Sequence, residues 1–152
     1  MTFEAIDPTN AVVALCVAGI AVEGTPAEAM RLFEQAWAAR RDDYDAAIAA
    51  HFIARHQLSP ALALHWNAVA VRHAEAVEDG RAAGLFASLY LNLADAQADA
   101  GDAAAGADSV RRATAHLAAL PPGGYRDLVA LGIGRLAARL GVAADEALAP
   151  SP

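Results

Sequence analysis

The chain has 152 residues and a mass of 15.6 kDa, enough for one domain with a sizeable core. Hydrophobic residues make up 57% of it and aromatic residues only 6%, because alanine is the most frequent residue type. The formal net charge is −7 and the sequence holds no basic stripe, which argues against a nucleic-acid partner.

The start of the chain resembles neither a secretory signal nor a membrane anchor. Residues 1–10 carry Glu4 and Asp7 and no basic residue. The apolar run over residues 11–22 is well short of the roughly 20 residues that cross a bilayer. Cys16, the only cysteine, lies in this run and is expected to be a buried thiol outside any disulfide. We therefore expect a soluble, cytoplasmic protein.

Helix start and stop signals divide the chain into seven predicted helices. Asp7-Pro8 places a capping residue before a proline at the first helical position, and Thr25 with Glu28 forms a capping box. Asp102 is expected to cap the sixth helix. No segment shows the alternating, β-branched pattern of a strand, so we expect an all-α fold. The predicted helices span residues 8–23, 26–40, 44–57, 60–79, 82–100, 103–119 and 125–140.

Short connections make successive helices antiparallel neighbours. We expect a single domain over residues 8–141, with flexible termini over 1–7 and 142–152. One spacing of small and large residues recurs three times, as in stacked helical hairpins followed by a capping helix. The three copies are Ala29-x3-Phe33-x2-Ala36, Ala63-x3-Asn67-x2-Ala70 and Gly106-x3-Val110-x2-Ala113.

Residues 90–102 resemble the first helix and turn of a tetratricopeptide repeat (TPR). Tyr90 stands for the large aromatic residue of the motif, and Ala94 is the small member of its Leu–small pair. The sequence departs from the motif at Val17 and His51, which stand where a small residue normally lets the two helices of a hairpin approach. The resemblance implies three helical hairpins and a capping helix, stacked as an α-solenoid.

TPR solenoids bind an extended peptide or a partner helix in a concave groove, so the resemblance implies a protein- or peptide-binding adaptor. Ile48, Phe52 and Leu91 would be its apolar anchors, with charged side chains orienting the partner. The two-carboxylate clamp that some TPRs use for chaperone tails is not expected, because only Arg55 and Arg126 could build it. The implied groove residues are Asp45, Ile48, Phe52, Arg55 and His56 in the second hairpin, Ser88, Leu91, Asp95 and Asp99 in the third, and Arg126, Val129, Ile133 and Leu136 in the capping helix.

Two of these groove residues have a simpler interpretation. Arg55 and His56 suit the C-terminal end of a helix, where cations interact favourably with the helix dipole. The alanine-rich run over residues 11–22 is apolar on several faces and could pack against a second copy as a homodimer.

The second hairpin offers an alternative function, because His51 and Asn67 are expected to face each other across it. A hydrogen bond between them, or to a nearby group, would satisfy both buried polar side chains. Alternatively they border a small polar pocket with Trp66, Tyr90 and Asn92, and the protein binds or senses a small molecule.

The remaining polar residues do not predict catalysis. His51 and His56 lack the i, i+4 spacing of a zinc pair. Ser59 and Ser88 lack a nucleophile elbow, and Cys16 has no base nearby in the sequence. We expect no enzyme, no metal, no cofactor and no membrane partner.

Overall fold

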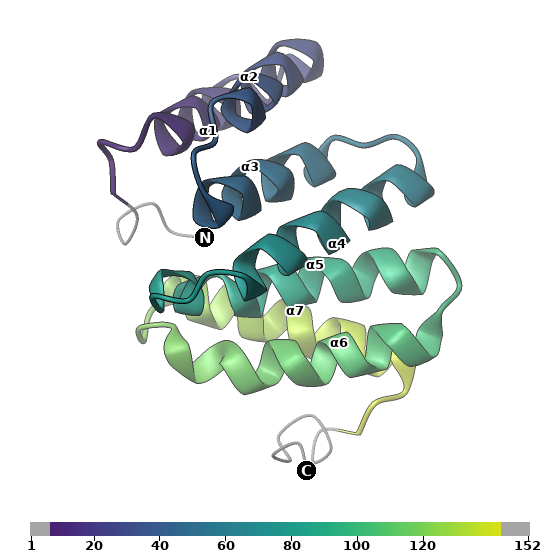
Figure 1. Cartoon of the computed structure of the whole chain (residues 1–152). Helices are drawn as coiled ribbons and strands as arrows, with labels where there is room; N and C mark the ends of the chain where they lie inside the picture. Colours follow the sequence, from purple (N-terminus) through teal and green to yellow (C-terminus); the bar gives the residue numbers. More distant parts are fainter. Residues whose placement is uncertain (1–6, 144–152) are drawn as a thin grey trace. The chain divides into compact units, whose positions relative to one another are not determined.

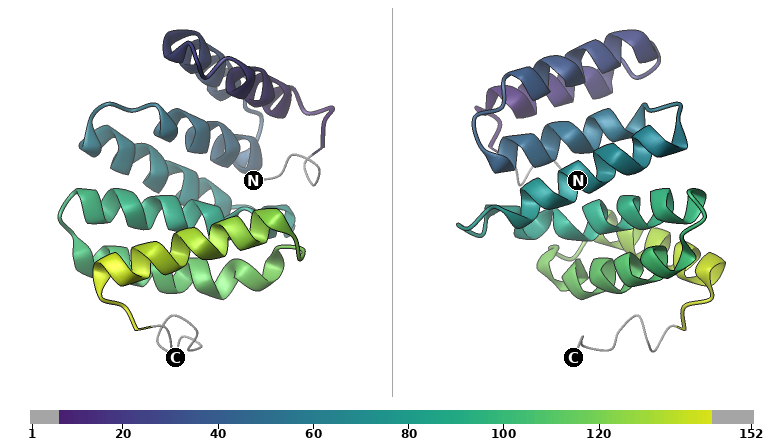
Figure 2. Two further views of the ribbon diagram at one scale, coloured as in Figure 1. Left: turned by 180° about the vertical axis from the view of Figure 1, so that it is seen from behind. Right: turned by 45° about the vertical axis from the view of Figure 1, so that its right-hand side comes forward.

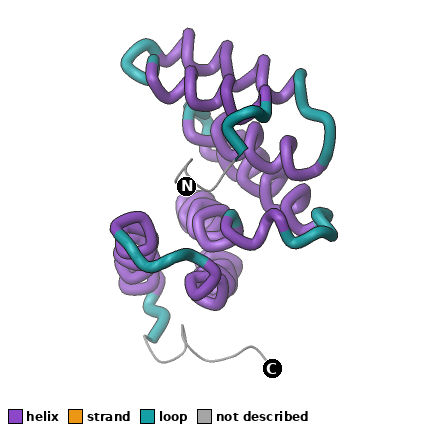
Figure 3. Tube along the Cα trace, turned by 90° about the vertical axis from the view of Figure 1, so that its left-hand side faces the viewer, coloured by secondary structure: helices purple, strands orange, loops and turns teal. Residues whose placement is uncertain are grey.

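The computed structural model describes residues 7–143, and these form helices and loops with no strand among them (Figures 1 and 3). The all-α prediction is confirmed for this part of the chain. The helices are α1 (Ala11–Ala21), α2 (Pro26–Ala38), α3 (Asp43–Arg55), α4 (Pro60–Glu75), α5 (Phe86–Asp99), α6 (Ala103–His116) and α7 (Gly124–Leu140), with two short 3-10 helices, η2 (Arg81–Gly84) and η3 (Leu117–Ala119).

The chain divides into two compact units, Thr2–Arg81 and Ala82–Pro152. We call their described parts, residues 7–81 and 82–143, the N-terminal unit and the C-terminal unit. The single domain over residues 8–141 stays a prediction. Most of the predicted flexible termini, residues 1–6 and 144–152, lies outside the described residues.

The first helix begins three residues later than predicted. The side chain of Asp7 accepts hydrogen bonds from the backbone N–H and the hydroxyl of Thr9 (2.9 and 2.6 Å), which makes a turn before the helix. Asn10 is the real cap, because its Oδ1 accepts from the N–H of Val12 at 2.8 Å. The predicted start at Asp7-Pro8 is therefore wrong.

The other predicted helix ends hold to different degrees. Asp102 caps α6 as predicted, accepting from the N–H of Ala105 at 3.0 Å. The predicted capping box does not form, because the Thr25 side chain makes no capping hydrogen bond. The Glu28 N–H bonds instead to the backbone carbonyl of Thr25 at 3.0 Å. Helix α4 ends at Glu75, four residues early, and a turn and η2 separate it from α5.

In the N-terminal unit, α1 and α2 form one hairpin, α3 and α4 form the next, and α3 packs on both α1 and α2. The rings of Phe33 and Phe52 stack at 5.4 Å in this core. The close approach of α1 to α2 occurs at Gly19, where a Cβ atom would overlap the Phe33 ring. Val17 was expected at this small position, but it is exposed. The expectation fails because α1 turns a different face toward α2.

In the C-terminal unit, α5 and α6 form a hairpin and α7 packs on both of its helices (Figure 2). Ala94 meets Gly106 where α5 and α6 come close, since a Cβ on Gly106 would lie 3.2 Å from the Ala94 carbonyl oxygen. Helix α7 ends at Leu140. The next residue, Gly141, has a left-handed φ of 69°, and Val142 N–H bonds to the Ala137 carbonyl at 2.9 Å. Within residues 7–143, no helix combines the length and apolar character needed to span a bilayer.

Candidate functional site

Three of the predicted groove residues on α3 are buried in the N-terminal unit. Asp45 and Ile48 are 0% exposed and Phe52 is 1% exposed. Every residue from Tyr44 to Ala54 is buried, because α3 packs against α1 and α2 as well as its hairpin partner α4. The prediction that these three side chains face a partner is therefore wrong, and they form part of the core.

Asp45 has a structural role that the sequence interpretation missed. One of its carboxylate oxygens accepts from the side-chain amide of Asn10 at 2.6 Å. The other accepts from the backbone N–H and the Nε of Arg41, at 3.1 and 3.2 Å. A buried carboxylate needs such donors. They join the start of α3 to the cap of α1 and to the α2–α3 connection.

Arg55 and His56, at the end of α3, gather around an acidic residue of their own unit. Nη2 of Arg55 lies 3.1 Å from Oε1 of Glu23, and Nε2 of His56 lies 3.2 Å from the same oxygen. The His56 ring also stacks on Phe33 at 5.4 Å. These contacts favour the simpler interpretation, in which both residues stabilise the C-terminal end of α3 and do not contact a partner.

His51 and Asn67 are both buried. The side-chain amide of Asn67 donates to the carbonyl of Ala63, one turn earlier on α4, at 2.9 Å. The His51 ring meets the Phe52 ring edge-on at 4.9 Å, and burial lowers the pKa of His51 to about 3. A bond between His51 and Asn67, and a ligand pocket beside them, stay predictions.

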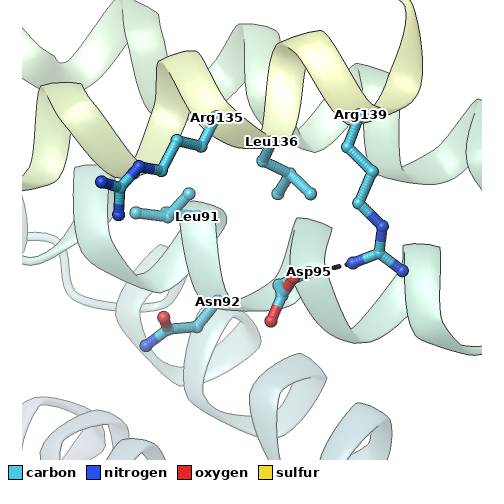
Figure 4. A pocket seen from close by; sticks show the side chains of 7 residues that line it. Leu91, Asn92, Asp95, Arg135, Leu136 and Arg139 are labelled. Carbon is cyan, nitrogen blue, oxygen red and sulfur yellow. Dashed lines mark hydrogen bonds and ion pairs between the residues drawn. The ribbon is translucent and has the colours of Figure 1, made fainter.

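The C-terminal unit contains a cavity of about 330 Å³ on a face shared by α5 and α7 (Figure 4). Leu91 and Leu136 give it an apolar floor, and polar side chains surround them. In Figure 4 the long side chains of Arg135 and Arg139 extend from α7 on either side of Leu136. The lining residues are Leu91, Asn92, Asp95, Gly132, Arg135, Leu136 and Arg139.

An ion-pair network borders one end of this cavity. Arg139 on α7 places Nη2 2.7 Å from Asp99 and Nη1 3.3 Å from Asp95, both on α5. The hydrogen bond to Asp99 raises the pKa of the Arg139 guanidinium above its usual range. Because all three side chains are about half exposed, water weakens these pairs and their main effect is to fix positions.

The other end of the cavity has a different character. Arg135 lies one turn before Arg139 on α7, and within residues 7–143 it makes no ion pair or hydrogen bond. Leu91 lies close to the α7 backbone, because a Cβ on Gly132 would be only 2.9 Å from its Cδ2 atom. Because Gly132 has no side chain, Leu91 can pack against the α7 backbone and form part of the cavity floor.

The predicted residues of the third hairpin divide between this cavity and the core. Leu91 and Asp95 line the cavity, and Asp99 adjoins it through Arg139. Ser88 is buried and its hydroxyl donates to the Leu85 carbonyl at 3.2 Å, so the prediction that it faces a partner is wrong.

Of the groove residues predicted on the capping helix, α7, only one lines the cavity. Leu136 lines the cavity, although it is as buried as Val129 and Ile133, each of the three being 5% exposed. Arg135 and Arg139 were missed. The i, i+4 spacing of these two arginines, matching that of Asp95 and Asp99, was the available signal.

A second cavity, of about 440 Å³, lies in the N-terminal unit and is strongly polar. Nδ1 of His73 lies 2.7 Å from Asp43, and Arg81 Nη2 lies 3.0 Å from Asp42. The Arg40 guanidinium lies 3.9 Å above the Trp37 ring. Each of these charged groups already has a partner in its own unit, which favours a structural role. The lining residues are Ala38, Arg40, Arg41, Asp42, Asp43, Ala46 and His73.

The described residues offer little for metal or thiol chemistry. Within residues 7–143, no three His, Cys, Asp or Glu side chains are placed to hold a metal ion. Burial raises the pKa of the Cys16 thiol to about 12, so it stays protonated and weakly nucleophilic at neutral pH.

No family model, curated protein or solved structure matches this chain.

Proposed function

We propose that the protein is a peptide-binding adaptor built of TPR-like helical hairpins, and that a partner's segment binds in the cavity between α5 and α7. The observation that carries the proposal is the cavity itself, whose apolar floor of Leu91 and Leu136 has charged side chains at its rim. Peptide-binding sites combine such an apolar anchor point with a polar rim that sets orientation.

The packing within each unit supports the TPR-like part of the proposal. A solenoid of hairpins needs close approach within each hairpin, and contact of the next helix with both helices of the hairpin before it. Gly19 and Gly106 provide the close approaches. Helix α3 packs on α1 and α2, and α7 packs on α5 and α6, so both units have this neighbour pattern.

The size of the cavity sets what it can hold. Ligand pockets commonly enclose roughly 300–1,000 Å³, so a cavity of about 330 Å³ fits a short extended segment better than a folded surface. Because Arg139 is already held by Asp95 and Asp99, the rim is ordered before a ligand arrives. Such preorganisation lowers the entropic cost of binding.

The test is to remove the apolar floor and measure peptide binding. We expect Leu91→Ala to weaken binding of peptides, selected on the wild-type protein from a random phage-displayed library, by about tenfold, since a buried apolar contact of this size is worth about 1–2 kcal/mol. Leu128→Ala is the matched control, because Leu128 lies on α7 but is 65% exposed and outside the cavity.

Circular dichroism and thermal melting would establish that both variants fold. A Leu91→Ala protein that folds and binds its peptides as tightly as the wild type would contradict a site at this cavity.

A further inference from the structure

We infer that the segment bound between α5 and α7 carries a carboxylate beside a bulky apolar side chain, with the carboxylate on Arg135 and the apolar group on Leu91 and Leu136. This inference rests on the proposed function and names the chemistry of its ligand. It starts from the difference between the two ends of the cavity.

Helices α5 and α7 present two matching rows of residues at the cavity. At one level Arg139 of α7 is shared by Asp95 and Asp99 of α5, which are one turn apart. One turn earlier on α7 stands Arg135, and the α5 residues that line the cavity at this end are Leu91 and Asn92. At this end of the cavity α7 therefore contributes the cation Arg135, and the lining residues of α5 contribute no acid.

The difference between the paired Arg139 and Arg135 indicates whether the ligand carries a negative or a positive charge. A basic ligand would have to share Asp95 and Asp99 with Arg139, which already lies 3.3 and 2.7 Å from them and offsets their charge. An acidic ligand meets Arg135, which has no ion pair or hydrogen bond to break among residues 7–143. A guanidinium also presents paired N–H donors that fit a carboxylate. The cavity therefore favours an anionic group at the Arg135 end.

The apolar part of the ligand follows from the floor. Leu91 lies against the α7 backbone at Gly132, beside Leu136 and directly next to the side chain of Arg135 (Figure 4). A ligand whose carboxylate reaches Arg135 therefore places its neighbouring residue over the two leucines. Burying a large aliphatic or aromatic side chain there adds affinity that a charge alone would not supply.

The first experiment selects a phage-displayed library of random peptides of about 12 residues on the full-length protein. We expect the selected peptides to be enriched in Asp or Glu adjacent to Leu, Ile, Phe or Met. A fluorescently labelled selected peptide should then bind about 5–10-fold more tightly than the same peptide with its acid changed to Gln or Asn, as expected for one charge-assisted hydrogen-bonded pair.

A charge exchange assigns the effect to Arg135. In Arg135→Glu we expect the preference to reverse, so that a peptide with Lys in place of the acid binds better than the acidic one. Arg31→Glu is the matched control, since Arg31 is an exposed arginine on α2 in the N-terminal unit and does not line the cavity. It should keep the preference of the wild type.

The experiments distinguish a failure of the proposed function from a failure of the inference on ligand charge. If the library yields no binding peptide, the proposed function itself falls. If peptides bind but the acidic and amide forms bind equally well, or if Arg135→Glu keeps the acidic preference, the inference on ligand charge is overturned while peptide binding stands.

Discussion

Asp45 holds the start of α3 against the start of α1 through a buried carboxylate. Asn10 takes part twice, because its Oδ1 caps α1 while its side-chain amide donates to Asp45 at 2.6 Å. Arg41 completes the set from the α2–α3 connection. A group that was predicted to meet a partner thus serves to position three segments of the N-terminal unit.

We expect Asp45→Asn to lower the free energy of unfolding by about 1–3 kcal/mol. The amide loses the charge that strengthens its hydrogen bonds, and its NH2 group faces donors instead of acceptors. Urea unfolding measures the change. Asp99→Asn makes the same substitution in an exposed pair with Arg139 and should cost less than about 1 kcal/mol. Equal losses in the two variants would contradict a special role for Asp45.

At the scale of the helix, two glycines in helix interiors have opposite surroundings. Gly19 on α1 lies under the ring of Phe33, whereas a Cβ on Gly134 of α7 would meet open space. In both places alanine favours the helix by about 1 kcal/mol, because glycine loses more backbone entropy on folding. The surroundings therefore decide the sign of each substitution.

We expect Gly134→Ala to stabilise the protein by about 0.5–1 kcal/mol and Gly19→Ala to destabilise it by about 1–3 kcal/mol, since Phe33 must move away from α1. Thermal melting of the two variants beside the wild type measures both changes. A Gly19→Ala protein that melts above the wild type would show that α1 and α2 do not approach at this residue.

The sequence predicts helix ends better than it predicts which helix face is free. Asp102 caps its helix as expected, because capping depends on a few neighbouring backbone N–H groups. Asp7 accepts from the Thr9 N–H as a cap would, but the chain after it forms a turn, and the helix starts only after Asn10. The order of the helices in the chain was enough to predict the hairpins, since short connections join neighbours.

The faces of α3 depend on contacts distant in sequence. Its groove face was inferred from the family resemblance, although most residues over 44–54 are apolar whichever face they lie on. A helix that is apolar all round is typically enclosed, and α3 is enclosed by α1, α2 and α4. The pairing of α7 with α5, which brings Arg139 to Asp95, also joins distant segments, so Arg135 and Arg139 were not found from the sequence.

For the molecule as a whole, each unit holds a histidine whose charged form is disfavoured. His51 packs on Phe52 in the N-terminal unit, and His116 stacks on Phe86 at 4.7 Å and on Tyr90 at 5.8 Å in the C-terminal unit. Burial lowers the pKa of both rings, and for His116 the nearby Arg112 lowers it further. Mild acid should therefore destabilise both units at a pH where most carboxylates stay ionised.

The size of this effect can be worked out for His51. Its pKa is about 3 in the folded state and about 6.5 when unfolded, so the unfolded chain binds the proton first as the pH falls. Its contribution to stability is complete above pH 6.5 and is lost on going down toward pH 3, by about 1.4 kcal/mol for each pH unit. Between pH 7 and pH 5 the free energy of unfolding should fall by roughly 2 kcal/mol on this account.

Urea unfolding followed by tryptophan fluorescence tests this in the unit that contains His51, because both tryptophans, Trp37 and Trp66, lie there and meet edge-on at 5.1 Å. We expect His51→Gln to lose most of the difference between pH 7 and pH 5, whatever its stability at pH 7. His65→Gln, at an exposed position, should keep the difference seen in the wild type. If His51→Gln loses as much stability in acid as the wild type, the acid sensitivity of this unit arises from other groups, and the buried ring of His51 is not its cause.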